Sequence, residues 1–362
     1  MSGTIKSEMK SSSYTTFEKA NYELELTPEH GITEGGFLTV SLPPGSIFME
    51  DNVFSDSKRP GTVDKFKLYN VSKNKIIVEM MKEHLVADNP LRFSLLGVRN
   101  PRSFEPSSGF QIETLDPGKY KVDIGGQDIN LVMNRMNHFS SLTVTPKNLT
   151  NGAVTDYAVA FASEVFVNQS DILTFQFPLT VRFTEATTCV VPPGTVDTNC
   201  LVKVTCGTVG KKLVVAMDEL RCRTGNYHLI VTDIKNPPST KKSDPFWQIF
   251  MSDSKFYDVQ QVKDLTKTAI QTKHIANITG FKVEQTIEDY KTLSSYTVTF
   301  MPENEVSRYG VIRLTWSEQI EVAEDTECMV ITYKKFTDDS NLCKFDREKG
   351  QLVIEGAFVD KH

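Results

Sequence analysis

Two landmarks recur along this chain at matched distances, and this recurrence limits the possible fold more than any other feature. The first landmark is a tyrosine that opens an alternating segment, at Tyr22, Tyr157 and Tyr296. The second opens an apolar segment, at Phe37, Ile172 and Val311. From the first copy to the second, both move by the same distance (157 − 22 = 135 and 172 − 37 = 135); from the second to the third, both move by 139 (296 − 157 and 311 − 172). Landmarks that move together indicate an internal repeat.

A third landmark, an Asn-Pro pair at the end of a strand-like segment, recurs in the first two copies only. Leu91–Pro101 matches Tyr227–Pro237, an offset of 237 − 101 = 136. In a third copy the same proline would fall near 237 + 139 = 376, beyond His362. The sequence therefore predicts an incomplete third repeat, within a longer array.

Each full copy contains about seven short alternating segments bounded by Gly, Pro, Asn and Asp, which is typical of an antiparallel β-sandwich. In the second copy we expect strands near residues 140–147, 157–166, 171–178, 200–207, 212–218, 226–234 and 246–252. The only helical candidates are the connectors 128–137 and 259–272, which could equally be strands. We predict an all-β chain of tandem immunoglobulin-like antiparallel β-sandwich domains, arranged like beads on a string. The expected boundaries are 1–138, 139–275 and 276–362, the last being incomplete.

Charge and hydropathy exclude two classes of partner. Forty Lys and Arg against 46 Asp and Glu give a net charge of −6, whereas nucleic-acid binding depends on a basic surface. The longest apolar runs, such as 213–217, are strand-length and far short of the roughly 20 residues of a membrane helix. No apolar segment typical of a signal peptide follows Met1. We expect no nucleic acid and no membrane span within this chain.

The six cysteines follow the repeat. Cys189 lies 11 residues after Pro178, and Cys328 lies 11 residues after the equivalent Ser317. At the same place the first copy has Phe54, and a position that takes either Cys or an apolar residue suits a core disulfide better than a metal ligand. We expect Cys189 to pair with Cys200, Cys328 with Cys343, and Cys206 with Cys222. Four cysteines in the second repeat nevertheless allow three connectivities.

The cysteine spacing does not fit zinc. Zinc sites use close Cys pairs or nearby His ligands, whereas the six His here are scattered. Disulfides imply an oxidising compartment, and four Asn-x-Ser/Thr sequons agree with it: Asn70, Asn148, Asn168 and Asn277. We predict an extracellular or cell-surface protein carrying N-glycans on these asparagines.

No residue pattern indicates catalysis or a cofactor. No Gly-x-Ser-x-Gly or phosphate-binding loop occurs, and His228 is interpreted as a solvent-facing strand residue. The acidic pairs Glu324-Asp325 and Asp338-Asp339 could ligate calcium, but they lack EF-hand alternation and are better interpreted as solvated loop charge. We expect a protein that is not an enzyme, with no metal and no cofactor.

The second repeat resembles the repeated β-domains of large ciliate cell-surface proteins. The likeness rests on the Tyr157 strand, the segment 172–178, the following Cys pair and the segment 234–249. It extends more loosely to the first repeat, which has no Cys, and to the third. Those proteins carry tandem units and a later Cys-rich region of growth-factor-receptor type, which is not seen in these residues. The resemblance implies a location at the cell or ciliary surface, within a longer anchored precursor, and implies no reaction.

Two functions follow from these observations. The first is a non-enzymatic structural or adhesive array, a filament or a recognition complex, whose partners are other surface or extracellular proteins or further copies of itself. A polar arm at 7–16 is a weak candidate for self-pairing and is better interpreted as a frayed first strand. The alternative is a ligand-binding receptor ectodomain, for example in mating, with the long loop 48–64 as its recognition surface.

Overall fold

The computed structural model describes residues 3–49, 54–55, 66–81, 86–193, 199–289, 291–304, 306, 310–323, 326–332, 335–337, 343–346 and 348–355. The chain divides into two compact units. The first comprises Met1–Lys147, Asp156–Ile234 and Asp244–Ile270, and the second comprises Asn148–Thr155, Lys235–Ser243 and Gln271–His362. The three predicted repeat boundaries stay a prediction, because the units do not follow the repeat.

Strands dominate the described residues, which confirms the all-β class. The helical candidates did not become α-helices. The connector 259–272 contains one 3-10 turn, η1 (Leu265–Thr268), and the connector 128–137 ends at a two-residue strand. Within the described ranges, no helix has the length and apolar character needed to cross a membrane.

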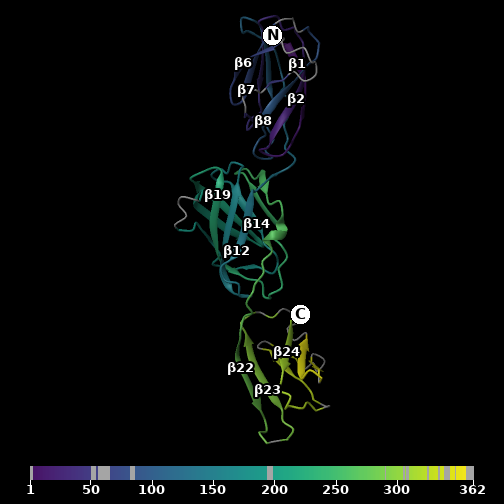
Figure 1. The fold of residues 1–362 in the computed structure, drawn as a ribbon, viewed down its shortest axis with the longest axis vertical. Helices are drawn as coiled ribbons and strands as arrows, with labels where there is room; N and C mark the ends of the chain where they lie inside the picture. Colours follow the sequence, from purple (N-terminus) through teal and green to yellow (C-terminus); the bar gives the residue numbers. More distant parts are fainter. Residues whose placement is uncertain are drawn as a thin grey trace. The chain divides into compact units, whose positions relative to one another are not determined.

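The first ten strands form the first domain, in which Figure 1 labels β1, β2 and β6–β8. They are β1 (Gly3–Ser11), β2 (Lys19–Pro28), β3 (Phe37–Ser41), β4 (Ile47–Phe48), β5 (Phe54–Ser55), β6 (Phe66–Val71), β7 (Lys75–Met80), β8 (Leu91–Arg99), β9 (Gln111–Leu115) and β10 (Lys121–Gly125). They follow the order β4-β8-β2-β1-β10-β9-β3-β7-β6, with β5 on β8. β1 pairs antiparallel with β2 and in parallel with β10, so it joins the two layers.

The second domain has the same two layers, but here each layer is a separate sheet. Its elements are β11 (Asn137–His138), β12 (Ser141–Pro146), β13 (Val154–Ser163), β14 (Ile172–Gln176), β15 (Arg182–Phe183), β16 (Cys189–Val190), β17 (Leu201–Val209), β18 (Lys212–Leu220), β19 (Gly225–Lys235), β20 (Gln248–Ser252), β21 (Asp258–Gln261) and η1. One sheet has the order β11-β21-β20-β14-β18-β17, and the other β12-β13-β19-β15 with β16 on β19. The single strand β1 is thus replaced by β11 and β12, one in each sheet.

The third repeat contributes β22 (Ile278–Gln285), β23 (Tyr296–Pro302), β24 (Val311–Thr315), β25 (Val330–Thr332), β26 (Lys335–Thr337), β27 (Cys343–Asp346) and β28 (Gln351–Glu355). β22 pairs with β23, β25 with β26, and β24 and β27 both pair with β28. Among the described residues, Tyr296 of β23 is 47% exposed, whereas Tyr22 and Tyr157 are fully buried.

The register of the strands follows the repeat. Each landmark tyrosine pairs with the residue eleven positions before it, in the pairs Tyr22↔Ser11, Tyr157↔Pro146 and Tyr296↔Gln285. In the first two domains the tyrosine and alternate residues after it are buried, since successive side chains of a strand point to opposite faces. The segment 7–16 agrees in its first half with the interpretation as a first strand: residues 7–11 belong to β1, which pairs with β2 as far as Ser11.

Candidate functional sites

The Asn-Pro landmark holds together the loop that precedes the tyrosine strand in each of the first two repeats. The Asn100 side chain is fully buried, and its Nδ2 donates to the carbonyl oxygens of Ser13 at 3.0 Å and Thr15 at 2.9 Å. Its Oδ1 accepts a hydrogen bond from the hydroxyl of Tyr22. The landmark therefore has a structural reason: a side-chain amide satisfies backbone groups that no strand partner reaches.

The second repeat builds the same clamp from equivalent residues. Asn236 Nδ2 donates to the carbonyl oxygens of Asn148 and Thr150, both at 2.8 Å. These positions lie 136, 135 and 135 residues after Asn100, Ser13 and Thr15. The clamp is thus part of the repeating unit.

The clamped loop also guides the connector out of each repeat. Thr15 forms a parallel bridge with Arg135, and Thr150 forms one with His274. In the first repeat the next backbone amide, of Thr16, donates to the carbonyl oxygen of Arg135 at 2.9 Å. In the second repeat the amide of Asn151 donates to the carbonyl oxygen of His274, also at 2.9 Å. The connectors therefore follow the same path along both loops.

Inside the first unit, the loop of the first domain contacts the second domain directly. Thr16 Oγ1 donates to the carbonyl oxygen of Val259 at 2.7 Å, and the amide of Phe104 donates to the carbonyl oxygen of Asp258 at 2.9 Å. Asn137 of the connector pairs with Gln260 of β21. The connector is therefore a strand of the second domain as well as the exit of the first.

A buried ion pair lies at the same place. Arg102 Nη2 lies 3.0 Å from Asp171 Oδ1, and Nη1 bonds both Asp171 Oδ2 and, at 3.0 Å, the carbonyl oxygen of Phe166. The Asp171 side chain is 1% exposed. Burial raises the pKa of Asp171, and the guanidinium of Arg102 opposes that rise. A buried carboxylate needs such a partner, so this pair fixes Arg102 in one place.

Aromatic and cationic side chains pack beside the ion pair. The rings of Phe17 and Phe166 meet edge to face at 4.7 Å. Arg99 lies 4.4 Å over Phe17, and Arg223 lies 4.8 Å over Phe166. These contacts, together with the ion pair, attach the first domain to the second through several kinds of interaction. We call the residues Phe17, Arg102, Phe166 and Asp171 the joint.

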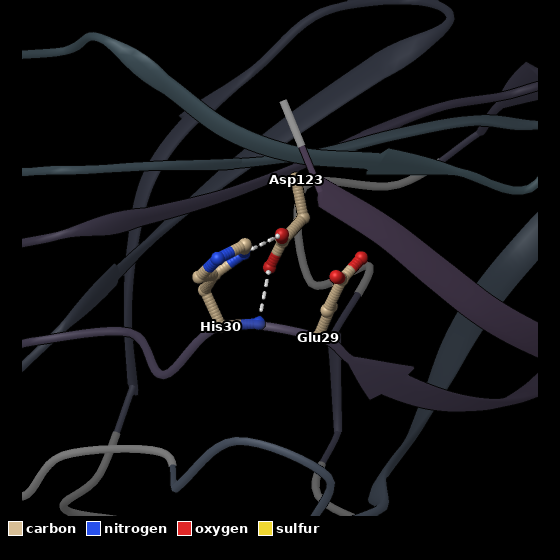
Figure 2. A group of neighbouring side chains, drawn as sticks. All are labelled: Glu29, His30 and Asp123. Carbon is tan, nitrogen blue, oxygen red and sulfur yellow. Dashed lines mark hydrogen bonds and ion pairs between the residues drawn. The ribbon is translucent and has the colours of Figure 1, made fainter. Parts of the chain in front are cut away.

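At the other end of β1 and β2, three ionisable residues gather (Figure 2). His30 Nδ1 lies 2.7 Å from Asp123 Oδ1, and the His30 amide donates to Asp123 Oδ2 at 3.1 Å. Glu29 Oε2 accepts hydrogen bonds from the amide of Thr4 at 2.7 Å and from its hydroxyl at 3.0 Å. Asp123 has a side chain with no exposed surface, while that of His30 is 56% exposed, and the hydrogen bond to Asp123 raises the pKa of His30.

This cluster was not predicted from the sequence. Asp123 follows His30 by 93 residues, and only the parallel pairing of β1 with β10 brings β10 to this end of the domain. Glu29 and His30 are adjacent, but strand alternation would place their side chains on opposite faces. The chain leaves β2 after Pro28 and bends, and both side chains then lie near Asp123. No spacing along the sequence signals that arrangement.

All six cysteines form disulfides, as predicted, but two of the expected pairings are wrong. The structure pairs Cys328 with Cys343 as expected, whereas the second domain has Cys189–Cys206 and Cys200–Cys222. Cys189 lies on β16 and Cys206 on β17, which belong to different sheets. The first bond thus joins the two sheets and the second closes the open end of the β17–β18 hairpin. Distance along the chain favours a disulfide between cysteines that are close in sequence, but the arrangement of the two sheets decides which cysteines meet.

Three sequon asparagines are exposed. These are Asn70, Asn148 and Asn277. Asn168 is half-buried, and its Oδ1 accepts a hydrogen bond from Arg223 beside the joint. Use of the four sequons stays a prediction.

The remaining candidate residues do not converge. His228 lies half-buried on β19, where its backbone amide donates to Asn199 Oδ1 at 2.9 Å. Glu324-Asp325 and Asp338-Asp339 lie outside the described residues, as does most of the loop 48–64. In that loop the backbone of Phe54 pairs with Leu95, as Cys189 pairs with Val231, so Phe54 occupies the predicted cysteine position.

No protein-family model and no curated protein matches this chain. Similar solved structures include the major pilin subunit of Bacillus cereus, at 9% identity and TM-score 0.28, covering 75% of this chain and 69% of that chain. The collagen adhesin of S. aureus matches at 9% identity and TM-score 0.23, covering 84% of this chain and 96% of that one. The N-terminal domain of a Streptococcus gordonii adhesin matches at 8% identity and TM-score 0.26, over 67% and 59%. These neighbours are one pilin subunit and two adhesins, and at such scores they carry no argument about this chain.

Proposed function

We propose that this chain is a non-enzymatic extracellular repeat protein that spaces and displays binding surfaces at a cell surface. The observation that carries the proposal is the asparagine clamp, present in two successive repeats at Asn100 and Asn236. A module that ends in the same clamped loop each time is built to be followed by another module. Tandem modules with this property give reach, which is what an adhesive or structural array requires.

The compartment follows from the cysteines. Three disulfides and no free cysteine in the described structure require an oxidising environment to form and persist. The exposed sequons support the same compartment and the N-glycans expected on them. We place the protein at the cell surface, and the ciliary surface is the finer location that its resemblance implies.

The location is tested on the cells that produce the protein. Intact cells are treated with an alkylating reagent and a membrane-impermeant biotin reagent, and the protein is then isolated and weighed before and after reduction. We expect the protein to carry biotin. We expect its six cysteines to become open to alkylation only once the protein has been reduced. Alkylation without reduction, with no biotin, would contradict a surface location.

The adhesive role is tested with beads coated covalently with the chain. Clumping of beads with one another indicates self-association, and attachment to the producing cells indicates another surface protein as partner. Beads coated with heat-denatured chain serve as the control. If the native coat produces neither result, the adhesive part of the proposal is wrong.

A further inference from the structure

We propose that Glu29, His30 and Asp123 bind a divalent transition-metal ion of the zinc class at the end of the first domain. The three side chains can each direct one ligand atom to a common point, since these atoms lie within 4.8 Å of one another. Figure 2 shows the ring of His30 directed toward the carboxylate of Asp123, with the carboxylate of Glu29 beside them.

The charge of Asp123 is the first argument. Its side chain has no exposed surface, and an isolated buried carboxylate is strongly disfavoured unless a cation compensates it. Among the described residues, the hydrogen-bond partners of the Asp123 carboxylate are His30 and, at 3.4 Å, the hydroxyl of Thr114. If the imidazole is neutral, no ion pair within the described ranges supplies a compensating charge to that carboxylate or to the neighbouring Glu29. The site therefore calls for a cation, either a proton on His30 or a metal ion shared by all three residues.

The second domain supplies the contrast. Gln260 pairs with Met251 on β21 and β20, as Asp123 pairs with Thr114 on β10 and β9. Gln260 is fully buried, and its Oε1 accepts a hydrogen bond from Ser163 at 3.0 Å. The residue equivalent to His30 is 30 + 135 = 165, a buried Val165. A neutral Gln and an apolar residue thus satisfy this position of the scaffold, so the fold itself does not require the charged residues of the first domain.

Gly3 shows how closely β1 covers the cluster. A Cβ atom at Gly3 would lie 2.2 Å from Asp123 Oδ1 and 2.4 Å from His30 Nδ1. Only a residue without a side chain allows His30 and Asp123 to approach under β1. Gly3 is paired with Asp123 in the parallel ladder, so its backbone holds this side of the site in place.

The donor set selects the class of ion. One imidazole nitrogen with two carboxylate oxygens suits Zn²⁺ and similar ions, whereas Ca²⁺ and Mg²⁺ prefer oxygen ligands alone. Three protein ligands leave at least one coordination position open. Because the His30 side chain is 56% exposed, we expect that open position to face solvent. A water molecule or a carboxylate of a partner can fill that position.

The test is calorimetric titration of the untagged full chain with Zn²⁺, with Ca²⁺ in a parallel run. We expect one Zn²⁺ per chain at this site and no Ca²⁺. His30→Gln, Asp123→Asn and Gly3→Ala should each weaken Zn²⁺ binding by about tenfold or more. The matched controls are Glu164→Gln, at the position equivalent to Glu29, and Gly207→Ala, where a Cβ meets nothing within 4 Å; both should bind like the unsubstituted chain.

Each outcome decides the proposal. Absence of stoichiometric Zn²⁺ binding overturns it, and so does binding that His30→Gln leaves unchanged, because the ion would then lie elsewhere. Circular dichroism and thermal melting show whether each variant is folded. If Asp123→Asn does not fold, His30→Gln and Gly3→Ala carry the test, since His30 is largely exposed and its substitution should leave the core intact.

Discussion

Where the second domain has Cys189, the first domain has Phe54, and the two residues pair with equivalent partners on β19 and β8. The second domain adds two disulfides to a layered fold that the first domain forms without any cysteine. The two domains keep the tyrosine strand and the asparagine clamp in common. The comparison teaches that strand register and the clamp define the repeat, whereas the means of stabilisation and the end-face chemistry vary between copies.

Reduction should separate the two domains more than any single substitution. The bonds Cys189–Cys206 and Cys200–Cys222 close loops of 17 and 22 residues, so each should stabilise the second domain by about 3 kcal/mol. Hydrogen exchange with and without a reducing agent, followed by peptide-resolved mass spectrometry, measures both domains in one sample. We expect loss of protection in β17–β19 and little change in β2 and β8. Equal losses in the two domains would show that they do not unfold independently.

Substitution of Arg102 should have the next largest effect. Arg102→Ala leaves the carboxylate of Asp171, which is 1% exposed, without its cation, and removing one partner of a buried pair costs about 3–5 kcal/mol. The control is Arg92→Ala: the side chains of Arg92 and Glu25 are 63% and 35% exposed, so solvent screens their ion pair and its loss should change stability little. Urea unfolding measures both variants. Similar losses for Arg92→Ala and Arg102→Ala would mean that the joint contributes no more than a surface pair.

The clamp gives a matched pair of substitutions. Asn100→Ala removes three hydrogen bonds in a buried loop and should cost about 2–4 kcal/mol, since an unpaired buried group costs more than its bond contributes. Asn236→Ala removes at least two equivalent bonds and should cost a similar amount. Urea unfolding with peptide-resolved exchange locates each loss. A cost at one asparagine and none at the other would break the proposed equivalence of the two loops.

Much of the fold could be predicted because the repeat fixes it. The offsets of 135 and 136 residues located Tyr157 and Asn236, and all seven strands expected in the second repeat match observed strands within about three residues at each end. Strand alternation and turn residues are local signals, so one copy is enough to find them.

What could not be predicted depends on which strands lie opposite one another. The sequence favours Cys189 with Cys200, but the two-sheet arrangement brings Cys189 to Cys206. His30 and Asp123 meet only because β1 pairs with β10 in parallel, and a parallel neighbour leaves no mark in the local pattern. The contacts of Arg102 in the joint were missed for the same reason. Its partner Asp171 lies in another repeat, and neither residue belongs to the repeated landmarks.

The smallest expected effect is a change in pH dependence at the joint. Burial raises the pKa of Asp171 in the folded chain, so the folded state binds a proton at this carboxyl more readily than the unfolded state does. The contribution of this group to stability therefore rises as the pH falls through its folded pKa, and declines as the pH rises through it. Asp171→Asn removes this gain in stability at low pH. The variant should therefore lose more stability than the parent on acidification from neutral pH toward pH about 4. Urea midpoints at the two pH values measure the difference between the slopes. Parallel profiles would mean that Arg102 holds the carboxylate ionised as easily in the joint as in water, and the ion pair would then distinguish the joint by geometry rather than by charge.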